Sequence, residues 1–215
     1  MKRIILLLCI LVNSNLYSQD FTFRSSQYTR KQELFDSLPV VKNSIVLLGN
    51  SITELFNVEF LQNPKVINRG IGSDQTIGVL MRLWSITKHK PKKIFIEIGV
   101  NDIAQRVPLD TMIINYKKII HAIKMDSKKT KIYIESILPV ANSGMIKYCN
   151  PKFNELIWVA NESLKKLALE KQCVFVDTYS EFVLNGEMNP DFTYDGIHLS
   201  AMGQRLLGKI LLRYI

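Results

Sequence analysis

The sequence predicts an α/β fold in which a parallel sheet is covered by helices on both faces. Five short apolar runs rich in β-branched residues are spaced along the chain, and helical patterns separate them. Strands that alternate with helices form parallel sheets, because each connection must cross back over the sheet. Several runs also end in glycine and polar residues, and such strand ends meet at one edge. The five predicted strands are residues 44–48, 65–68, 94–98, 131–139 and 173–177.

The segments between these runs carry helix signals. Apolar residues recur at intervals of three and four from Ile77 to Trp84, and Asp74 stands where an N-cap would accept backbone hydrogen bonds. Asn150 and Pro151 form a typical helix start, and Ser200 precedes the last amphipathic stretch. The predicted helices are residues 26–38, residues 54–60, one beginning at Asp74, one beginning at Pro108, residues 150–171, and one capped by Ser200.

Residues 1–18 show the pattern of a signal peptide. Lys2 and Arg3 precede an apolar run of nine residues, and a polar segment of small residues follows. The run is too short for a stable membrane anchor. We therefore expect cleavage after Ser18, export to the periplasm or the medium, and a single domain over residues 19–215, a normal length for one domain.

Composition excludes several classes of protein. The 47% hydrophobic and 22% charged residues are typical of a globular chain. Removing Lys2 and Arg3 lowers the formal net charge from +9 to +7, and no aromatic-interleaved basic motif indicates nucleic-acid binding. No Cys/His cluster has metal-ligand spacing, so we expect neither metal nor cofactor. The sequence carries no signal for a particular oligomeric state.

Ser51 stands at the end of the first predicted strand, directly after the turn residues Gly49 and Asn50. Ligands bind at this edge of open α/β sheets. A serine hydroxyl there is exposed to substrate, and a helix starting after it would point amides at developing negative charge. The alternative interpretation is that Ser51 only caps that helix.

A serine nucleophile needs a base, and the chain has three histidines. His89 lies in a basic connector and His121 on a predicted helix, which makes both poor candidates. His198 lies in the loop after the last strand, three residues after Asp195. An acid at that distance can orient the imidazole and stabilise its protonated form. The alternative is a turn in which Asp195 and His198 only bond each other.

Acyl transfer also requires donors for the oxyanion of the tetrahedral intermediate, each typically worth about 10²–10³ in rate. Three candidates lie at predicted strand ends: the Ser51 amide, the loop of Gly72 and Ser73, and the side chain of Asn101. As alternatives, Asn101 and Gly72 are ordinary turn residues.

Four segments together resemble the SGNH (GDSL-type) hydrolases, close to the platelet-activating-factor acetylhydrolase-like and carbohydrate O-acetylesterase branch. The resemblance implies a three-layer α/β/α sandwich with a five-stranded parallel sheet in flavodoxin-like order. It also implies a Ser-His-Asp esterase with Ser51, His198 and Asp195 as catalytic residues, and an oxyanion hole of Ser51, Ser73 and Asn101. The matching segments are residues 49–51, 70–74, 99–102 and 195–198.

Two positions depart from the family pattern. Asn50 stands where the family usually has Asp, which preserves shape but removes a charge. Ser73 stands where the family has its oxyanion glycine, so its Cβ restricts the backbone and Gly72 is the fallback donor.

We therefore expect an exported serine esterase that hydrolyses small acyl esters, foremost acetyl esters of carbohydrates, through an acyl-enzyme. The alternatives are a lysophospholipase or short-chain lipid esterase, and a non-catalytic carbohydrate-binding protein on the same fold. Phe192 and Tyr194 are candidates for stacking on a sugar, whereas Trp158 is expected in the core. Glu97 interrupts an apolar strand and needs a buried partner, for which Arg69 and Arg82 are candidates.

Overall fold

The computed structural model of the 215-residue chain describes residues 26–141 and 152–215. The predicted signal peptide and the predicted helix start at Asn150 and Pro151 lie outside these ranges. A five-stranded parallel sheet has the order β2-β1-β3-β4-β5, which confirms the predicted flavodoxin-like arrangement. The strands are β1 (Ile45–Gly49), β2 (Val66–Gly70), β3 (Lys93–Glu97), β4 (Lys131–Glu135) and β5 (Val174–Val176).

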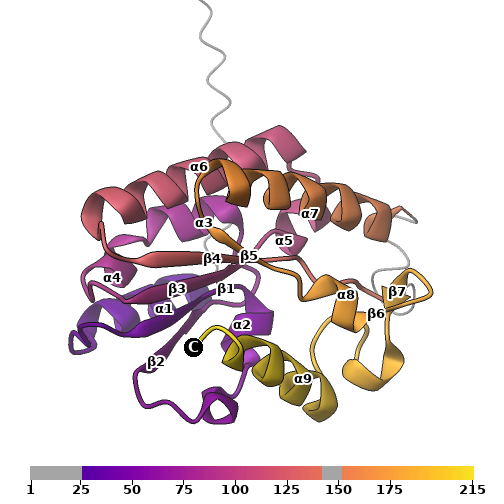
Figure 1. Cartoon of the computed structure of the whole chain (residues 1–215), viewed down its shortest axis with the longest axis horizontal. Coiled ribbons are helices and arrows are strands. Elements are labelled where there is room, and N and C mark those ends of the chain that lie inside the picture. Colours follow the sequence, from indigo (N-terminus) through magenta and orange to yellow (C-terminus); the bar gives the residue numbers. More distant parts are fainter. Residues whose placement is uncertain (1–25, 142–151) are drawn as a thin grey trace, which may run out of the picture.

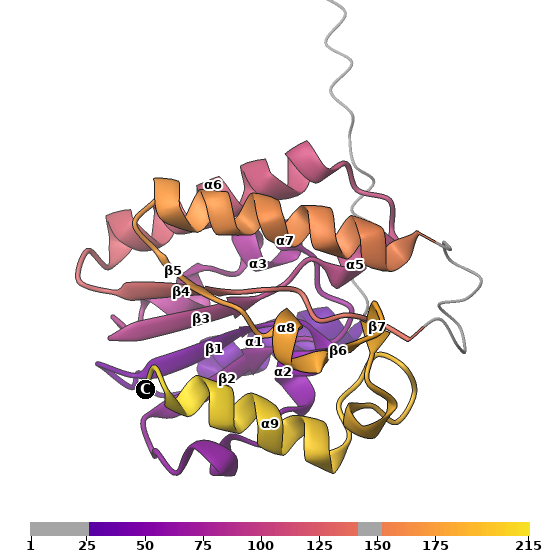
Figure 2. The same ribbon diagram turned by 45° about the vertical axis from the view of Figure 1, so that its right-hand side comes forward.

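Helices form a layer on each side of the sheet, so the predicted three-layer sandwich is confirmed. Figure 1 and Figure 2 show α6 (Leu109–Asp126) and α7 (Phe153–Glu170) over one face and α9 (Ala201–Leu212) over the other. No helix of the described ranges is long and apolar enough to cross a membrane. The remaining elements are α1 (Ser26–Ser37), α2 (Ser51–Leu55), η2 (Val58–Leu61), α3 (Thr76–Met81), α4 (Trp84–Thr87), α5 (Val100–Ala104), α8 (Tyr179–Phe182), β6 (Val183–Leu184), β7 (Glu187–Met188) and η4 (Pro190–Phe192).

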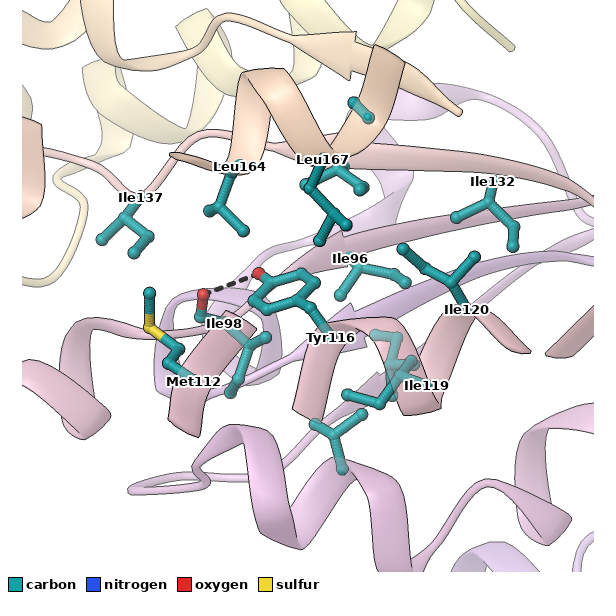
Figure 3. Close-up of a cluster of buried hydrophobic side chains, with 14 of the residues drawn as sticks. Ile96, Ile98, Met112, Tyr116, Ile119, Ile120, Ile132, Ile137, Leu164 and Leu167 are labelled. Atoms are coloured by element: carbon teal, nitrogen blue, oxygen red, sulfur yellow. Dashed lines mark hydrogen bonds between the residues drawn. The ribbon is translucent and has the colours of Figure 1, made fainter. Parts of the chain in front are cut away.

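The sheet is buried on both faces, which explains why its strands are almost continuously apolar. Successive side chains alternate between the faces: Val46 and Leu48 belong to the cluster with α6 and α7, whereas Ile45 and Leu47 belong to the cluster with α9. Figure 3 shows the first cluster, in which the Tyr116 hydroxyl donates to the Ile98 carbonyl at 2.8 Å. The polar tip of this buried ring is therefore satisfied within the core.

The predicted helix over residues 54–60 is wrong, because two short helices occupy this region. The first begins at Ser51 and ends at Leu55, where Phe56 turns to an extended conformation. The second, η2, has its own cap, since the Asn57 side chain accepts from the Glu59 amide at 2.9 Å. Asn57 thus satisfies an amide that a continuous helix would have satisfied internally.

The predicted N-cap role of Asp74 is also wrong. The cap of α3 is Gln75, which makes no capping hydrogen bond with its side chain. The Asp74 carboxylate instead accepts from the Arg82 guanidinium at 2.8 Å, and both side chains are buried. Asp74 keeps Arg82 because a buried charge without its partner is strongly destabilising, and the Asp102 carboxylate accepts from the first amide of α3, that of Thr76, at 3.0 Å.

The fourth strand is shorter than predicted. Its pairing with β5 ends at Glu135, which lies opposite Val176. Two asparagines of α7 then replace a neighbouring strand: Asn161 bonds both the amide and the carbonyl of Ile137, and Asn154 does the same at Val140. Side-chain amides therefore satisfy the backbone groups of Ile137 and Val140.

Candidate active site

The end of β1 delivers Ser51 to the carboxyl edge of the sheet. Asn50, not Ser51, caps α2, because its side chain accepts from the Ile52 amide at 2.8 Å. The alternative in which Ser51 is only a helix cap is therefore wrong. Gly70 at the end of β2 allows a close approach, since a Cβ there would lie 2.1 Å from the Glu54 nitrogen. The serine thus sits in the first turn of a helix pressed against the neighbouring strand end.

A tight loop near the C-terminus holds Asp195 and His198. It closes with a bridge between Thr193 and Leu199, and Gly196 has φ +95°, a conformation that favours glycine. One Asp195 oxygen accepts from the amides of Ile197 at 2.9 Å and His198 at 2.7 Å. These two backbone amides therefore fix the orientation of the carboxylate through one oxygen and leave its second oxygen available for another partner.

The structure brings Ser51, His198 and Asp195 into one hydrogen-bonded chain. The second Asp195 oxygen lies 2.6 Å from His198 Nδ1, and His198 Nε2 lies 3.0 Å from Ser51 Oγ. Burial would raise the pKa of Asp195, but hydrogen bonds from the His198 ring and the two amides outweigh it and lower the pKa. An ionised Asp195 holds the Nδ1 proton, which leaves Nε2 able to accept a proton from the serine.

The other two histidines have no part in this arrangement, as predicted. His89 is fully buried, and its Nδ1 accepts from the Val41 amide at 2.9 Å. Burial and, to a smaller extent, the charges of Arg69 and Lys88 lower the pKa of His89 to about 4. His121 lies exposed on α6.

A buried arginine fastens the loop that follows β2. Arg82 donates to the Asp74 carboxylate at 2.8 Å, to the Arg69 carbonyl at 2.7 Å and to the Gly49 carbonyl at 3.0 Å. The Gly49 carbonyl belongs to the end of β1, two residues before Ser51. One side chain therefore ties the loop carrying Ser73 to the strand that delivers the serine.

Within this loop, Ser73 and Gly72 have different roles. Ser73 has φ +61°, in the left-handed region where the family glycine fits more easily. The Gly72 amide donates to the Glu54 carboxylate at 2.5 Å, and the same carboxylate pairs with Lys31 at 2.9 Å. The fallback prediction is therefore wrong, because the Gly72 amide is already occupied and Ser73 is the remaining candidate of the two.

Asn101 lies in the first turn of α5 and reaches the same loop. Its Nδ2 donates to the Asp74 carbonyl at 2.9 Å, and a primary amide has a second N–H. Next to it, the Asp102 carboxylate accepts from the Thr76 amide at 3.0 Å and the Thr76 hydroxyl at 2.5 Å. Burial raises the pKa of Asp102 to about 6 against these hydrogen bonds. Two residues of α5, Asn101 and Asp102, therefore hold the loop after β2 through hydrogen bonds to Asp74 and Thr76.

Sequence reasoning missed Glu54 and the bond between Asp102 and Thr76 as supports of this loop. Glu54 could have been noticed, because it lies one helical turn after Ser51 and so near the same strand ends. No local pattern links Thr76 to Asp102, since they belong to helices after different strands.

The predicted partners of Glu97 are wrong. Arg82 pairs with Asp74, and Arg69 donates to the Asn68 carbonyl and lies over the Phe35 ring. The nearest partner of Glu97 is Asn50, whose Nδ2 lies 3.5 Å from one carboxylate oxygen. Burial raises the pKa of Glu97 to about 7 and is also the main reason why that of Glu135 rises to about 8.

The three aromatic candidates for stacking on a sugar differ in exposure and in their contacts. Trp158 is 57% exposed on α7, so its predicted core position is wrong. Phe192 packs edge-on against Phe182, with ring centroids 5.5 Å apart. Tyr194 alone contacts a residue of the hydrogen-bonded chain, since its ring stacks on the imidazole of His198.

Comparisons with known proteins find chains of the same fold. A provisionally assigned platelet activating factor from Streptococcus pneumonia has a TM-score of 0.79 and 30% identity, covering 87% of this chain and 92% of that one. A GDSL-like lipase from Bacteroides thetaiotaomicron gives 0.77 and 23%, covering 86% and 95%. An acetyl-xylooligosaccharide esterase from Geobacillus Stearmophilus gives 0.60 and 20%, covering 82% and 95%.

A curated relative is the N-acylneuraminate cytidylyltransferase of Escherichia coli O18:K1:H7, 27% identical over 189 residues. The match covers 85% of this chain but only 42% of that protein, so this chain corresponds to less than half of its length. The model of the GDSL-like Lipase/Acylhydrolase family matches residues 47–206, from β1 to α9. With most of its length matched, the chain belongs to the GDSL-like lipase/acylhydrolase family of ester hydrolases.

Proposed function

We propose that this chain is an exported serine esterase that removes small acyl groups, foremost acetyl, from carbohydrates through an acyl-enzyme. One observation carries the proposal: the continuous hydrogen-bonded chain from Ser51 through His198 to Asp195, with distances of 3.0 and 2.6 Å. These are the contacts that a general base needs with its nucleophile and its orienting acid.

In the first half of the reaction, Ser51 Oγ attacks the ester carbonyl while His198 Nε2 takes the serine proton. The Ser51 and Ser73 amides and the Asn101 side chain bind the oxyanion of the tetrahedral intermediate. The imidazolium then gives its proton to the alcohol oxygen as the C–O bond breaks. The alcohol leaves, and the acyl group remains on Ser51.

In the second half, water attacks the acyl-enzyme and His198 takes its proton. The same donors bind the second oxyanion, and the proton returns to Ser51 as the acid leaves. Asp195 remains ionised throughout and stabilises the imidazolium, in agreement with its lowered pKa.

The hydrogen-bonded chain disfavours the alternative of a non-catalytic carbohydrate-binding protein. Support for a carbohydrate substrate comes from the names of similar proteins: one concerns N-acylneuraminate and another acetyl-xylooligosaccharides. Acetylated sialic acids and acetylated xylo-oligosaccharides are therefore the first substrates to test.

The proposed nucleophile is tested by p-nitrophenyl acetate hydrolysis and by labelling with a fluorophosphonate probe. We expect Ser51→Ala to abolish both turnover and labelling. Ser163→Ala is the matched control, because Ser163 lies half-buried on α7, away from the Ser51–His198 pair, and its hydroxyl donates to the Val159 carbonyl one turn earlier. Equal rates for wild type and Ser51→Ala would reject the serine mechanism.

The substrate class is tested by acetate release from acetylated xylo-oligosaccharides and O-acetylated sialic acids, next to p-nitrophenyl acetate and decanoate. We expect acetate release from a carbohydrate and a preference for acetyl over decanoyl. A preference for the decanoyl ester would replace the carbohydrate substrate with a lipid.

We propose export on the basis of the basic start and apolar run of residues 1–18. Expression of the full chain in a bacterial host and N-terminal sequencing of the extracellular or periplasmic fraction test this. A mature N-terminus at Gln19 is expected, whereas an uncleaved cytoplasmic protein would contradict export.

A further inference from the structure

Tyr194 lies beside the proposed base with most of its surface open. Its ring stacks on the imidazole of His198, with centroids 5.9 Å apart and planes inclined by 19°. The side chain is nevertheless 65% exposed, one of the highest values among the large apolar and aromatic residues that the structure describes. Because an aromatic ring stabilises a fold by being buried, a ring that is mostly exposed contributes little by packing. An exposed ring next to reactive atoms is instead typical of a binding site.

The position of this ring is set by the backbone around it. The Tyr194 amide donates to the His198 carbonyl at 3.2 Å, next to the bridge that closes the loop. The Thr193 hydroxyl donates to the same carbonyl at 2.8 Å. Among residues 26–141 and 152–215, none hydrogen-bonds the Tyr194 hydroxyl. The ring is therefore anchored at its base, and no part of the chain that the structure describes occupies its hydroxyl.

Tyr194 lies on one particular side of the proposed reaction. The candidate oxyanion donors Ser73 and Asn101 belong to the loop after β2 and to the first turn of α5. Tyr194 belongs instead to the loop of the base. During acylation His198 must hand its proton to the alcohol oxygen, so the alcohol part of the ester lies next to the imidazole. The ring that stacks on this imidazole therefore borders the space of the alcohol rather than that of the acyl group.

We propose that Tyr194 is the platform on which a pyranose ring, the alcohol part of the acetyl ester, stacks. This inference rests on the proposed function and names the side of the site that selects a carbohydrate. The apolar C–H face of a pyranose fits the negative face of an aromatic ring, and binding sites commonly combine such a ring with a few polar groups. The hydroxyl of Tyr194 can bond a sugar hydroxyl at the edge of the stack.

The other aromatic candidates do not fit this role. Phe192 is half-buried, and its ring packs edge-on against Phe182. Trp158 is exposed to a similar degree as Tyr194, but it lies on α7 and makes no ring contact with His198. Trp158 is therefore the matched control for loss of an exposed aromatic side chain.

The test compares two acetyl esters with different alcohols: methyl O-acetyl-β-D-xylopyranoside and ethyl acetate. p-Nitrophenyl acetate is unsuitable here, because its own ring would also stack. We expect Tyr194→Ala to lower kcat/KM for the xyloside about three- to tenfold more than for ethyl acetate, mainly through KM. Tyr194→Phe should keep most of the discrimination, since it keeps the ring. Trp158→Ala should leave the ratio of the two substrates unchanged.

A different role of Tyr194 would give a different pattern. If the ring only holds the imidazole in place, Tyr194→Ala lowers kcat equally for both esters, which overturns the inference. A wild type that cleaves ethyl acetate but not the xyloside also overturns it while leaving the esterase intact.

Binding provides a readout that does not need turnover. Saturation-transfer NMR with Ser51→Ala should detect the acetylated xyloside, and the signal should weaken in the double variant that also carries Tyr194→Ala. If wild type cleaves neither ester, the proposed function fails. If the xyloside nevertheless binds and its binding depends on Tyr194, the role of Tyr194 as a sugar platform is still supported. Absence of binding, or binding unaffected by Tyr194→Ala, removes it.

Discussion

The two sides of the candidate site are built in opposite ways. The side of the candidate oxyanion donors is held by buried charge, since the ion pair of Arg82 and Asp74 is almost completely hidden from solvent. The side of the base is an open loop, in which the side chains of His198 and Asp195 remain 25% and 38% exposed. Its shape comes from backbone hydrogen bonds and from Gly196.

Because of this difference, substitutions on the buried side should mainly change the stability of the fold, and substitutions on the exposed side should mainly change the rate of the reaction. Removing one partner of a buried ion pair leaves an uncompensated charge, so a change on the buried side should destabilise the fold. At the exposed loop, water can solvate a polar group that has lost its partner, so a substitution there should cost little stability and should affect the reaction instead. Substitutions on the two sides should therefore alter stability and activity independently.

The largest effect is expected from Asp195→Asn on the exposed side. The variant keeps an oxygen for the backbone amides but no longer favours the proton on His198 Nδ1, so we expect kcat to fall by about 10³–10⁴. The free energy of unfolding should change by less than about 1 kcal/mol. Esterase kinetics and urea denaturation measure the two quantities. A loss of stability that matches the loss of activity would contradict the comparison.

On the buried side, Arg82→Met should reverse this pattern. It leaves Asp74 buried without its partner and frees the Arg69 and Gly49 carbonyls. We expect the free energy of unfolding to fall by about 3–5 kcal/mol. Arg213→Met is the control, because the pair of Arg213 with Glu181 is exposed and such pairs contribute about 1 kcal/mol or less. Equal effects of the two substitutions would show that burial of the pair does not matter.

Asn101→Ala tests whether the buried side also takes part in the reaction. Its side chain holds the Asp74 carbonyl and has one N–H left for the oxyanion. We expect kcat to fall by about 10²–10³ with little change in KM, as for loss of one oxyanion donor. Steady-state kinetics with p-nitrophenyl acetate measure both kcat and KM. A fall of less than tenfold would assign Asn101 to the support of the loop alone.

The smallest effect concerns Glu97 beneath Asn50. Its folded-state pKa of about 7 is raised above its ordinary value of 4.5, so the folded state keeps a proton that the unfolded state has lost. Stability should therefore fall as pH rises from about 4.5 to 7, by at most about 1.4 kcal/mol per pH unit. Glu97→Gln removes this contribution, and its stability relative to wild type should grow over the same interval.

Urea denaturation at several pH values measures this dependence. Glu181→Gln serves as the control for loss of a carboxylate, because Glu181 is exposed and its pair with Arg213 lies at the surface. Glu135 is present in both proteins, but the charge of Glu97 adds to the burial that raises the pKa of Glu135, so the measured difference contains this coupling as well. A difference between wild type and Glu97→Gln that stays constant from pH 5 to 8 would show that Glu97 titrates normally.

The sequence by itself determined the fold class, the strand order and the residues of the proposed catalytic chain. Apolar runs alternate with amphipathic segments, and this period is set by local geometry that no distant contact can change. The segment from Asp195 to His198 could also be recognised, because three of its hydrogen bonds join residues at most three positions apart. The four family-like segments together supplied the strand order and the roles.

Only the tertiary structure decided the partners of the buried polar groups. Asp74 was expected to cap a helix and Arg69 or Arg82 to pair with Glu97, but Arg82 binds Asp74 across eight positions in the chain. The contact between Ser51 and His198 spans 147 positions. A buried charge takes whichever partner the packed strands and helices bring near, and that choice depends on three-dimensional neighbours rather than on local pattern. For the same reason the exposure of Tyr194 and Trp158 could be read only from the folded chain.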